Sequence, residues 1–378
     1  MNQKIARFLA EQRPATPCLV LDLDIVEENY HALASAMPDA RIFYAVKANP
    51  EPQILSLLAG LGSCFDTASV PEIEMALAAG ASPDRISYGN TIKKKADVQR
   101  AFELGVRLFA YDSQAELEKI AEVAPGARVF CRILTSGEGA EWPLSRKFGC
   151  DLEMARDLLR KAGPLGVIPY GVSFHVGSQQ KDLTQWDKAL GQVAQLFHDL
   201  EAEGIDLCMV NLGGGFPTRY RSDVPDSQAY GQAIFDAIRL HFGNRIPETI
   251  IEPGRGMVGN AGVIESEVVL ISRKSATDER CWVYLDIGKF GGLAETMDEA
   301  IQYPIETDYD EMDPEVERVI LAGPTCDSAD VLYEKADYRL PVNLRIGDRL
   351  RIKATGAYTT TYSAVNFNGF APLKAYCI

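Results

Sequence analysis

Several short apolar runs in the first two thirds of the chain end on residues that can do chemistry. In chain order these residues are Lys47, Asp66, Arg132, His175, Gly213, Gly214, Gly215 and Glu252. A lysine amine that is partly buried loses its proton more easily and can form a Schiff base with a carbonyl cofactor. The run FYAVKAN places Lys47 at the end of such a segment, where a lysine also commonly extends into solvent. The elements that carry these residues decide between the two interpretations.

A glycine triplet and a nearby arginine indicate a site for an anion. Gly213, Gly214 and Gly215 allow the backbone to approach phosphate oxygens and to present N–H donors to them. By itself a glycine triplet is typical of a flexible turn. The run EPGR adds Glu252 and Arg255, and a guanidinium donates to phosphate in a bidentate manner. Alone this run would be a Pro-Gly turn with solvated charges, but together the two motifs favour a phosphate site.

Three further residues stand out for their local context. His175 is one of four histidines and is followed by Gly177 and Ser178, which predicts a position at the mouth of a strand. Cys326 lies in the loop GPTCDS. A free cysteine usually packs as a small hydrophobe, but this loop favours a reactive thiol. Tyr358, in GAYT, is a weaker signal because a tyrosine there could simply pack.

The hydrophobic pattern from about residue 40 onward alternates between short β-branched or aromatic runs and longer stretches with helical spacing. The predicted strands are 41–46, 63–66, 85–88, 106–110, 128–132, 172–176, 207–211 and 249–252. The stretches between them include the predicted helices 52–61, 71–79, 93–104, 114–123 and 183–203. Units of this kind predict an α/β fold built on a (β/α)8 TIM barrel. Catalytic groups of such barrels lie at the carboxyl ends of the strands, where the residues named first all fall.

After about residue 262 the long helical stretches give way to strand-like runs. This change predicts a second domain of antiparallel β type, which the first residues of the chain join. We therefore expect a barrel over residues 22–261 and a β domain made of residues 1–21 plus 262–378.

Composition and charge narrow the classes of partner. The chain has 378 residues and a formal net charge of -15, which argues against nucleic-acid and anionic-membrane partners. It has eight cysteines but no CxxC pair, so no metal site is predicted. The N-terminal segment does not resemble a signal peptide, and no stretch is long and apolar enough to span a membrane. We expect a cytoplasmic protein with reduced thiols.

Six motifs in chain order carry a family resemblance. They are YAVKAN (44–49), SFHVGS (173–178), GGGFP (213–217), EPGR (252–255), GPTCD (323–327) and GAY (356–358). With them the chain resembles the fold-type III, alanine-racemase-like pyridoxal-phosphate decarboxylases, above all the ornithine decarboxylases and their bacterial lysine/ornithine relatives. The motifs extend over nearly the whole chain and are highly specific as a set. Asn211, where many relatives carry Asp before the glycines, is a small departure.

The resemblance implies pyridoxal 5'-phosphate as cofactor and a role for each group. Lys47 would hold the cofactor until the substrate amine displaces it. His175 would stack on the pyridine ring, and Glu252 would keep the ring nitrogen protonated, which makes the ring an electron sink. Asp66 and Arg132 would support Lys47 and His175. The residues implied to grip the phosphate are Ser178, Gly213, Gly214, Gly215, Arg255 and Tyr358.

The resemblance also implies the reaction and a homodimer. Cys326 would return a proton to the substrate α-carbon after decarboxylation, and the β-domain residues would come from the partner subunit. Asp298 and Asp327 would bind the distal ammonium of the substrate, although Glu299 could replace Asp298. The implied reaction converts L-ornithine to putrescine, and L-lysine to cadaverine as a second activity, in polyamine biosynthesis.

Three alternatives remain open. A meso-diaminopimelate decarboxylase shares the fold and the cofactor, but it typically carries Glu where this chain has Asp327 and needs cationic groups for a distal carboxylate. An amino-acid racemase would use a tyrosine as the opposing base and has no evident need for Cys326. A catalytically inactive regulatory homologue would not need to retain Lys47, Glu252, Arg255 and Cys326 together.

Overall fold

The computed structural model describes residues 2–142, 147–312 and 314–378, and the chain divides into two compact units. The barrel unit comprises Glu27–Pro217 and Val224–Met257. The β unit comprises Met1–Val26, Thr218–Asp223 and Val258–Ile378. Each unit is described by itself below.

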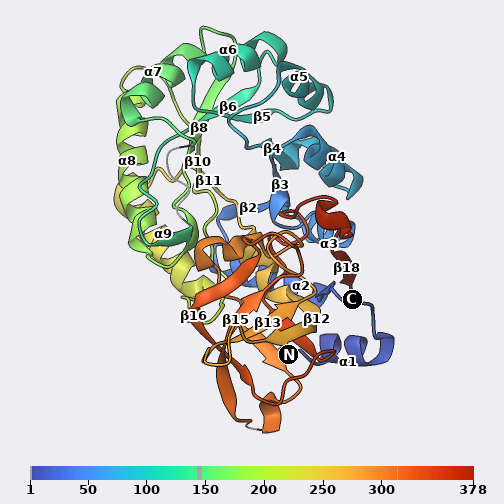
Figure 1. The fold of residues 1–378 in the computed structure, drawn as a ribbon. Helices are drawn as coiled ribbons and strands as arrows, with labels where there is room; N and C mark the ends of the chain where they lie inside the picture. The colour runs from blue at the N-terminus through green and yellow to red at the C-terminus, as the bar shows by residue number, and fades with distance from the viewer. Residues whose placement is uncertain (1, 143–146, 313) are drawn as a thin grey trace. The chain divides into compact units, whose positions relative to one another are not determined.

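The barrel unit is built on a closed barrel of parallel strands in the order β10-β11-β2-β3-β4-β5-β6-β8 (Figure 1). The strands are β2 Ala40–Ala45, β3 Cys64–Thr67, β4 Ile86–Tyr88, β5 Leu108–Tyr111, β6 Arg128–Arg132, β8 Ile168–Ser173, β10 Met209–Asn211 and β11 Glu248–Ile251. Inward-pointing side chains fill the barrel, in a cluster of Phe43, Cys64, Leu108, Ala110, Phe130, Met209 and Ile250. The predicted TIM barrel is confirmed.

Helices alternate with these strands and lie on the outside of the barrel (Figure 1). They are α2 Leu23–Ala36, α3 Pro52–Gly60, α4 Val70–Ala78, α5 Lys95–Glu103, α6 Gln114–Val123, α7 Leu152–Ala162, α8 Thr184–Glu201 and α9 Ser227–Phe242, and the short α10 Arg255–Val258 follows β11. At the start of several of these helices a side-chain oxygen accepts a hydrogen bond from an N–H group of the first turn. Asp226, for example, accepts a hydrogen bond from Ala229 N at 2.8 Å at the start of α9, because the first N–H groups of a helix lack partners within it.

Two predicted boundaries are wrong in ways that matter for function. Strand β8 ends at Ser173, so His175 lies in the loop that follows rather than inside a strand. Helix α5 begins at Lys95, which leaves Lys93 in the preceding loop although its sequence context predicts a helix. By contrast, α6 spans the predicted residues 114–123.

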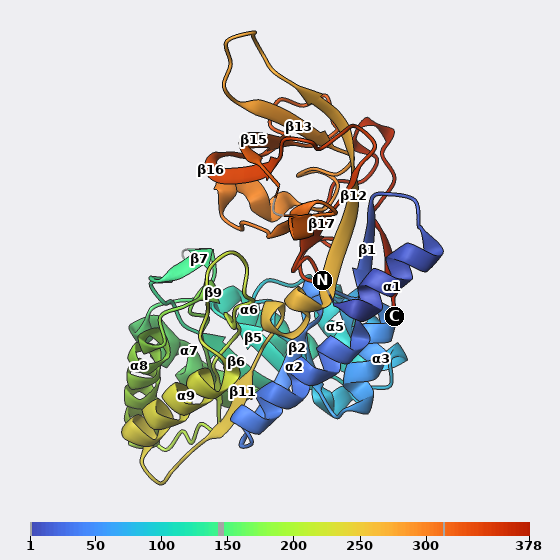
Figure 2. The ribbon, with the colours of Figure 1, turned by 90° about the horizontal axis from the view of Figure 1, so that it is seen from below.

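The β unit contains an eight-stranded, mostly antiparallel sheet in the order β14-β17-β12-β13-β15-β16, with β1 pairing both β12 and β18. Its elements are α1 Gln3–Gln12, β1 Cys18–Leu21, β12 Gly262–Ser272, β13 Cys281–Leu285, β14 Ile305–Thr307, β15 Val316–Ala322, β16 Val331–Pro341, β17 Arg349–Lys353 and β18 Lys374–Cys377. Figure 2 shows the long strand β12 running through this unit, where β1, β13 and β17 pair with it. The predicted β domain is thereby confirmed as a fold type.

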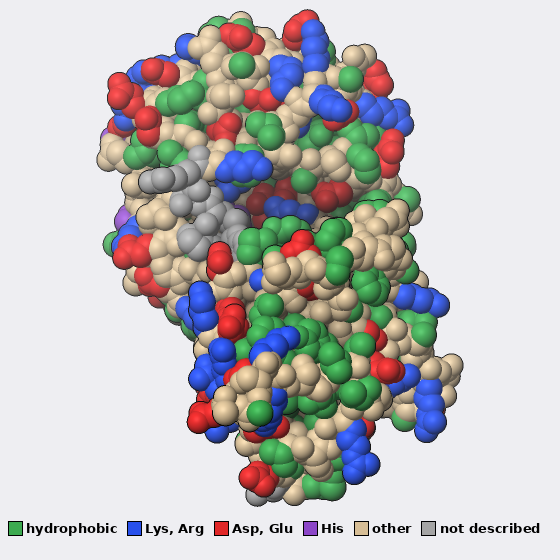
Figure 3. Space-filling view, viewed as in Figure 1, with side chains coloured by type: hydrophobic (Ala, Val, Ile, Leu, Met, Phe, Trp, Pro, Cys, Tyr) green, Lys and Arg blue, Asp and Glu red, His purple; other side chains and the backbone are tan. Residues whose placement is uncertain are grey.

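The surface carries charges of both signs. On the face drawn in Figure 3, acidic and basic side chains are interspersed, and hydrophobic side chains gather over the strands of the β unit. Among the described residues, no helix is long and apolar enough to cross a membrane.

Candidate active site

The barrel residues singled out from the sequence meet at the carboxyl ends of the parallel strands. Lys47 lies in the short 3-10 helix η1 (Val46–Ala48) directly after β2. Asp66 is in β3, and Arg132 is the last residue of β6. His175 and Glu252 follow β8 and β11 by two residues and one residue. Because all eight strands are parallel in a closed barrel, their ends form one mouth, as the sequence predicts.

Lys47 and Asp66 form the first interacting pair of the site. Lys47 Nζ lies 3.8 Å from Asp66 Oδ2, and the side chain of Lys47 is 49% exposed while that of Asp66 is 6% exposed. Ser87 Oγ donates to Asp66 Oδ1 at 3.3 Å. Burial raises the pKa of Asp66, and the charges of Lys47 and Arg132 together with the Ser87 hydrogen bond oppose this rise. The pKa of Asp66 therefore lies above its ordinary value, and the cations beside it limit the rise.

Glu252 is a buried carboxyl whose protonation is balanced near neutral pH. Burial and the neighbouring Asp66 raise the pKa of Glu252 to about 7, although Asn211, Lys47 and Arg132 act to lower it. Asn211 Nδ2 donates to Glu252 Oε1 at 2.5 Å, which fixes the carboxyl group. A group with such a pKa can hold or release a proton at a fixed point. Asn211, a departure from many relatives in sequence, thus has a direct role in the site.

His175 is held as a neutral ring. Its Nδ1 accepts a hydrogen bond from Gly177 N at 3.0 Å, so we assign the proton to Nε2. Burial and the charges of Arg132 and Lys47 lower the pKa of His175 well below its ordinary value. A neutral, fixed imidazole is suited to packing against a flat ring rather than to carrying charge.

The glycine triplet allows the backbone to approach closely at this mouth. Gly213 has φ +65° and Gly215 has φ +99°. A Cβ at Gly213 would lie 2.2 Å from Phe174 O, and one at Gly215 would lie 2.6 Å from Gly177 O. At both positions a larger residue would be strained and would clash. Asn211 Oδ1 accepts from Gly213 N at 2.9 Å and so helps to hold the loop.

Arg255 and Ser178 complete an anion-binding arrangement beside these glycines. The guanidinium of Arg255 donates to Ser178 Oγ through Nε at 3.3 Å and through a terminal nitrogen at 3.2 Å. Arg255 is only 3% exposed, and a buried guanidinium favours an anionic ligand. The barrel mouth therefore combines an amine, a titratable carboxyl, a neutral imidazole and a buried guanidinium.

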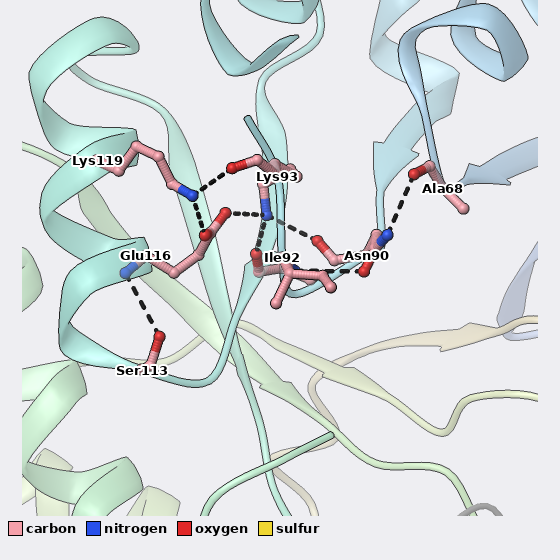
Figure 4. Close-up of polar contacts among 8 residues, drawn as sticks. Ala68, Asn90, Ile92, Lys93, Ser113, Glu116 and Lys119 are labelled. Carbon is pink, nitrogen blue, oxygen red and sulfur yellow. Dashed lines mark hydrogen bonds and ion pairs between the residues drawn. The ribbon is translucent and has the colours of Figure 1, made fainter. Parts of the chain in front are cut away.

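A buried ion-pair network that was not predicted supports this mouth (Figure 4). Lys93 Nζ lies 2.9 Å from Glu116 Oε1 and donates to the backbone oxygens of Asn90 at 2.7 Å and Ala110 at 2.6 Å. Burial lowers the pKa of Lys93 to about 8, and Glu116 opposes this effect. Asn90 Nδ2 in turn donates to Ala68 O at 3.3 Å. The network thus links the loops after β3 and β4 to strand β5 and to helix α6.

No local sequence pattern indicates this network. Lys93 stands among three consecutive lysines in a polar stretch, which is typical of a solvated helix start. Its burial follows from contacts with residues more than fifteen positions away, such as Ala110.

Four predicted site residues lie in the β unit rather than in the barrel unit. Cys326 is exposed, and its N–H donates to Asn368 Oδ1 at 3.1 Å. Its loop is held by Asp330, whose Oδ2 accepts from Thr325 N at 3.1 Å and from Thr325 Oγ1 at 2.7 Å. The supporting residues Asn368 and Asp330 were not predicted, because no residue spacing indicates them.

The other three β-unit residues lie in loops and turns. Tyr358 has φ +57° in the segment after β17. Asp327 Oδ1 accepts from Ala329 N at 2.8 Å, which leaves its other oxygen for further contacts. Asp298 is exposed and has φ +53°. Glu299, the alternative to Asp298, uses both carboxylate oxygens in hydrogen bonds to strand β16.

Comparisons with known proteins agree with one family. Residues 23–259 match the family described as "Pyridoxal-dependent decarboxylase, pyridoxal binding domain". A lysine/ornithine decarboxylase of Selenomonas ruminantium is 37% identical over 98% of this chain and 91% of its own length. Antizyme inhibitor 2 of Xenopus laevis is 33% identical over 98% of this chain and 82% of its own length. A lysine/ornithine decarboxylase from Vibrio vulnificus complexed with putrescine has a similar structure, with a TM-score of 0.87, 29% identity and coverage of 99% and 97% of the two chains.

The buried Lys93–Glu116 pair predicts a stability effect. Lys93→Met leaves the Glu116 carboxylate with only the partly exposed Lys119 as a cationic partner, and loss of one member of such a buried pair costs up to roughly 3–5 kcal/mol of unfolding free energy. The exposed pair of Lys95 and Glu122 offers a matched control, since Lys95→Met should cost less than about 1 kcal/mol. Urea unfolding followed by circular dichroism measures both. Equal losses in the two variants would contradict the importance of the buried network.

The raised pKa of Glu252 predicts a pH dependence of stability. An unfolded glutamate titrates at about 4.3, whereas folding raises the pKa of Glu252 to about 7. Between these values the folded protein holds a proton that the unfolded chain has lost, so the free energy of unfolding falls as the pH rises, by about 3 kcal/mol at pH 7 and above. Urea unfolding of protein stripped of bound small molecules, from pH 5 to pH 8, tests this. In Glu252→Gln the free energy of unfolding should lose this part of its pH dependence. A pH dependence equal to that of the wild type would contradict the raised pKa of Glu252.

Proposed function

The chain belongs to the family of pyridoxal-dependent decarboxylases, and we propose that within this family it removes the α-carboxylate of a small basic amino acid, L-ornithine first and L-lysine as a second substrate. The observation that carries the proposal is the joint position of Lys47, Glu252 and the glycine loop at one end of the barrel. These groups match the aldehyde, the ring nitrogen and the phosphate of pyridoxal phosphate.

The barrel residues would hold the cofactor in the following way. Lys47 would hold the cofactor through its amine, with Asp66 3.8 Å away to pair with that amine. The neutral ring of His175 would contact the pyridine ring. Glu252, held by Asn211, would hold a proton at the ring nitrogen. The bound cofactor supplies an electron sink for the electrons that remain when carbon dioxide leaves.

The phosphate would be bound by backbone and side-chain donors. The N–H groups of the glycine loop lie beside Arg255 and Ser178, and a closely approaching backbone with a buried guanidinium suits a dianionic group. Tyr358 of the β unit would add a hydroxyl donor. This group of residues would hold the phosphate and so fix the cofactor in the site.

We further propose that the active enzyme is a homodimer with shared sites, in which the β domain (residues 1–21 and 262–378) of one subunit serves the barrel domain (residues 22–261) of its partner. Cys326, exposed on its loop, would return a proton to the α-carbon of the product. We also propose that the protein works in the cytoplasm, where its cysteines would stay reduced.

The substrate class follows from the acids of the β unit. Asp298 is exposed, and Asp327 has one carboxylate oxygen that the Ala329 hydrogen bond does not use. Two acids would attract a distal ammonium and would repel the distal carboxylate of meso-diaminopimelate. Ornithine and lysine then yield putrescine and cadaverine, which are polyamine precursors. The related lysine/ornithine decarboxylase of Selenomonas ruminantium supports this choice.

A second candidate function is that of a regulator without catalytic activity. We consider this function because antizyme inhibitor 2 of Xenopus laevis is 33% identical to the chain. The retained Lys47, Glu252, Arg255 and Cys326 favour the enzyme, because a regulator has no use for a proton donor or a cofactor lysine.

A substrate panel separates these functions. Purified protein should show the visible absorbance of bound pyridoxal phosphate, and Lys47→Ala should abolish both this absorbance and turnover. Carbon dioxide release is measured with ornithine, lysine, arginine and meso-diaminopimelate. We expect ornithine to react fastest, and lysine at a value of kcat/KM within about 10–200-fold of it, the range that one methylene can discriminate. No visible cofactor absorbance in the wild type, together with no turnover of any of the four, would favour the regulator.

The proton-return role of Cys326 predicts a turnover defect. Cys326→Ala should lower kcat by about a hundredfold or more, as loss of a positioned acid does, while KM for ornithine changes little. Cys208 is also exposed, so Cys208→Ala is the matched control and should behave as the wild type. A kinetically normal Cys326→Ala enzyme would remove this residue from the mechanism.

A further inference from the structure

A short segment of the β unit holds an unusual backbone conformation. The 3-10 helix η4 (Ala294–Glu299) is interrupted at Met297, and both Asp298 and Glu299 have positive φ, +53° and +59°. Residues other than glycine rarely adopt this left-handed region, and two in succession are disfavoured further. Contacts elsewhere must therefore stabilise the segment.

The side chain of Glu299 supplies such contacts. Its Oε1 accepts hydrogen bonds from Glu334 N at 2.8 Å and Lys335 N at 2.7 Å. Its Oε2 accepts from Ala336 N at 2.7 Å. A carboxylate that binds three backbone N–H groups is held firmly, since each bond is charge-assisted. Burial tends to raise the pKa of Glu299, but these donors outweigh it and lower the pKa below its ordinary value.

The three donors are available because strand β16 is irregular opposite β15. Val319 pairs with Tyr338 and Leu321 pairs with Tyr333, so residues 334–337 of β16 stand opposite the single residue Ile320. Extra residues in a bulge leave the ladder locally unpaired. Successive N–H groups directed to one point form a site for an anion, and the Glu299 carboxylate occupies it.

Two tyrosines of β16 hold the residues that follow Glu299 in the chain. Tyr333 Oη donates to Ile301 O at 2.7 Å and accepts from Tyr303 N at 2.9 Å. Tyr338 Oη donates to Tyr303 O at 2.8 Å, and the two tyrosine rings stack with centroids 4.2 Å apart. Residues 299–303 are thus hydrogen-bonded to β16 at Glu299, Ile301 and Tyr303. Met297 and Asp298 precede this segment and are exposed.

We propose that Glu299 is a positioning residue for substrate length: by binding the bulge of β16 it fixes where the Asp298 carboxylate sits, and so which diamino acid fits. This inference rests on the proposed function, because it takes Asp298 as the residue that meets the distal ammonium of the substrate. Glu299 itself does not contact substrate, since both its oxygens are engaged with β16. The selectivity between ornithine and lysine therefore depends on a residue outside the pocket.

Substrate selectivity provides the kinetic test. The ratio of kcat/KM for ornithine to that for lysine is measured for the wild type and for Glu299→Ala. The ratio should move by about tenfold or more, since the discrimination of one methylene amounts to about 10–200-fold, while kcat on the preferred substrate changes less than about threefold. Glu299→Gln keeps one acceptor oxygen and should give an intermediate ratio, which covers the case in which Glu299→Ala folds poorly. Glu279→Ala, at an exposed glutamate of the same unit, should keep the wild-type ratio.

A double-mutant cycle tells positioning from general destabilisation. If Glu299 acts through Asp298, the ratio in Asp298→Ala should not change further when Glu299→Ala is added. Additive effects of the two substitutions on the ratio would overturn the proposal, as would an unchanged ratio in both Glu299 variants.

Hydrogen exchange provides a readout that does not need activity. The amides of residues 334–336 should be protected in the wild type and exchange at least about tenfold faster in Glu299→Ala, with Glu279→Ala unchanged. Faster exchange with an unchanged ratio would mean that Glu299 holds the bulge of β16 but does not set substrate specificity, which overturns the proposal. If the wild type turns over no diamino acid, the proposed function itself fails, and the exchange rates still show whether Glu299 holds the bulge.

Discussion

Four charged side chains at the end of the barrel depend on one another for their state. Asp66 and Glu252 are buried together with Lys47 and Arg132 close by, and burial alone would neutralise both acids. The cations oppose the rise in the pKa of Asp66, while burial and the neighbouring Asp66 raise the pKa of Glu252 toward neutrality. The same cations keep His175 neutral. Removing any one of these charges would change the proton affinity of the others, so the site acts as a unit.

Other charged side chains hold the loops and segments that carry the proposed site residues. Lys93 and Glu116 tie together the loops at the mouth from inside the barrel unit. In the β unit, Asp330 holds the Cys326 loop and Glu299 holds the segment of Asp298. In each case a buried or half-buried charge binds backbone groups, which fixes a loop more firmly than apolar packing can. Loops that carry the proposed site residues are therefore held by charged side chains that bind backbone groups.

Much of the fold and of the barrel site could be predicted because the signals are local. Helix α6 follows from the period of its apolar residues and from Ser113, which caps its first turn. Lys47, Asp66 and Glu252 could be recognised because each stands at or near the end of a short apolar run. Prediction failed where distant contacts decide the outcome. His175 was placed inside a strand that ends earlier, and Lys93 was placed in a helix, although Ala110 and Glu116 hold it in a buried loop.

The sequence by itself determined the alternation of strands and helices, the chemical types at the strand ends and the family to which the motifs point. These depend on residue order and on periodicity, which act over a few positions along the chain. Only the tertiary structure decided the proton affinity of Glu252, the engagement of Glu299 with β16 and the burial of Lys93. The reason is physical: Coulomb energies and desolvation depend on distances and burial among groups from far-apart segments, and these exist only once the chain has folded.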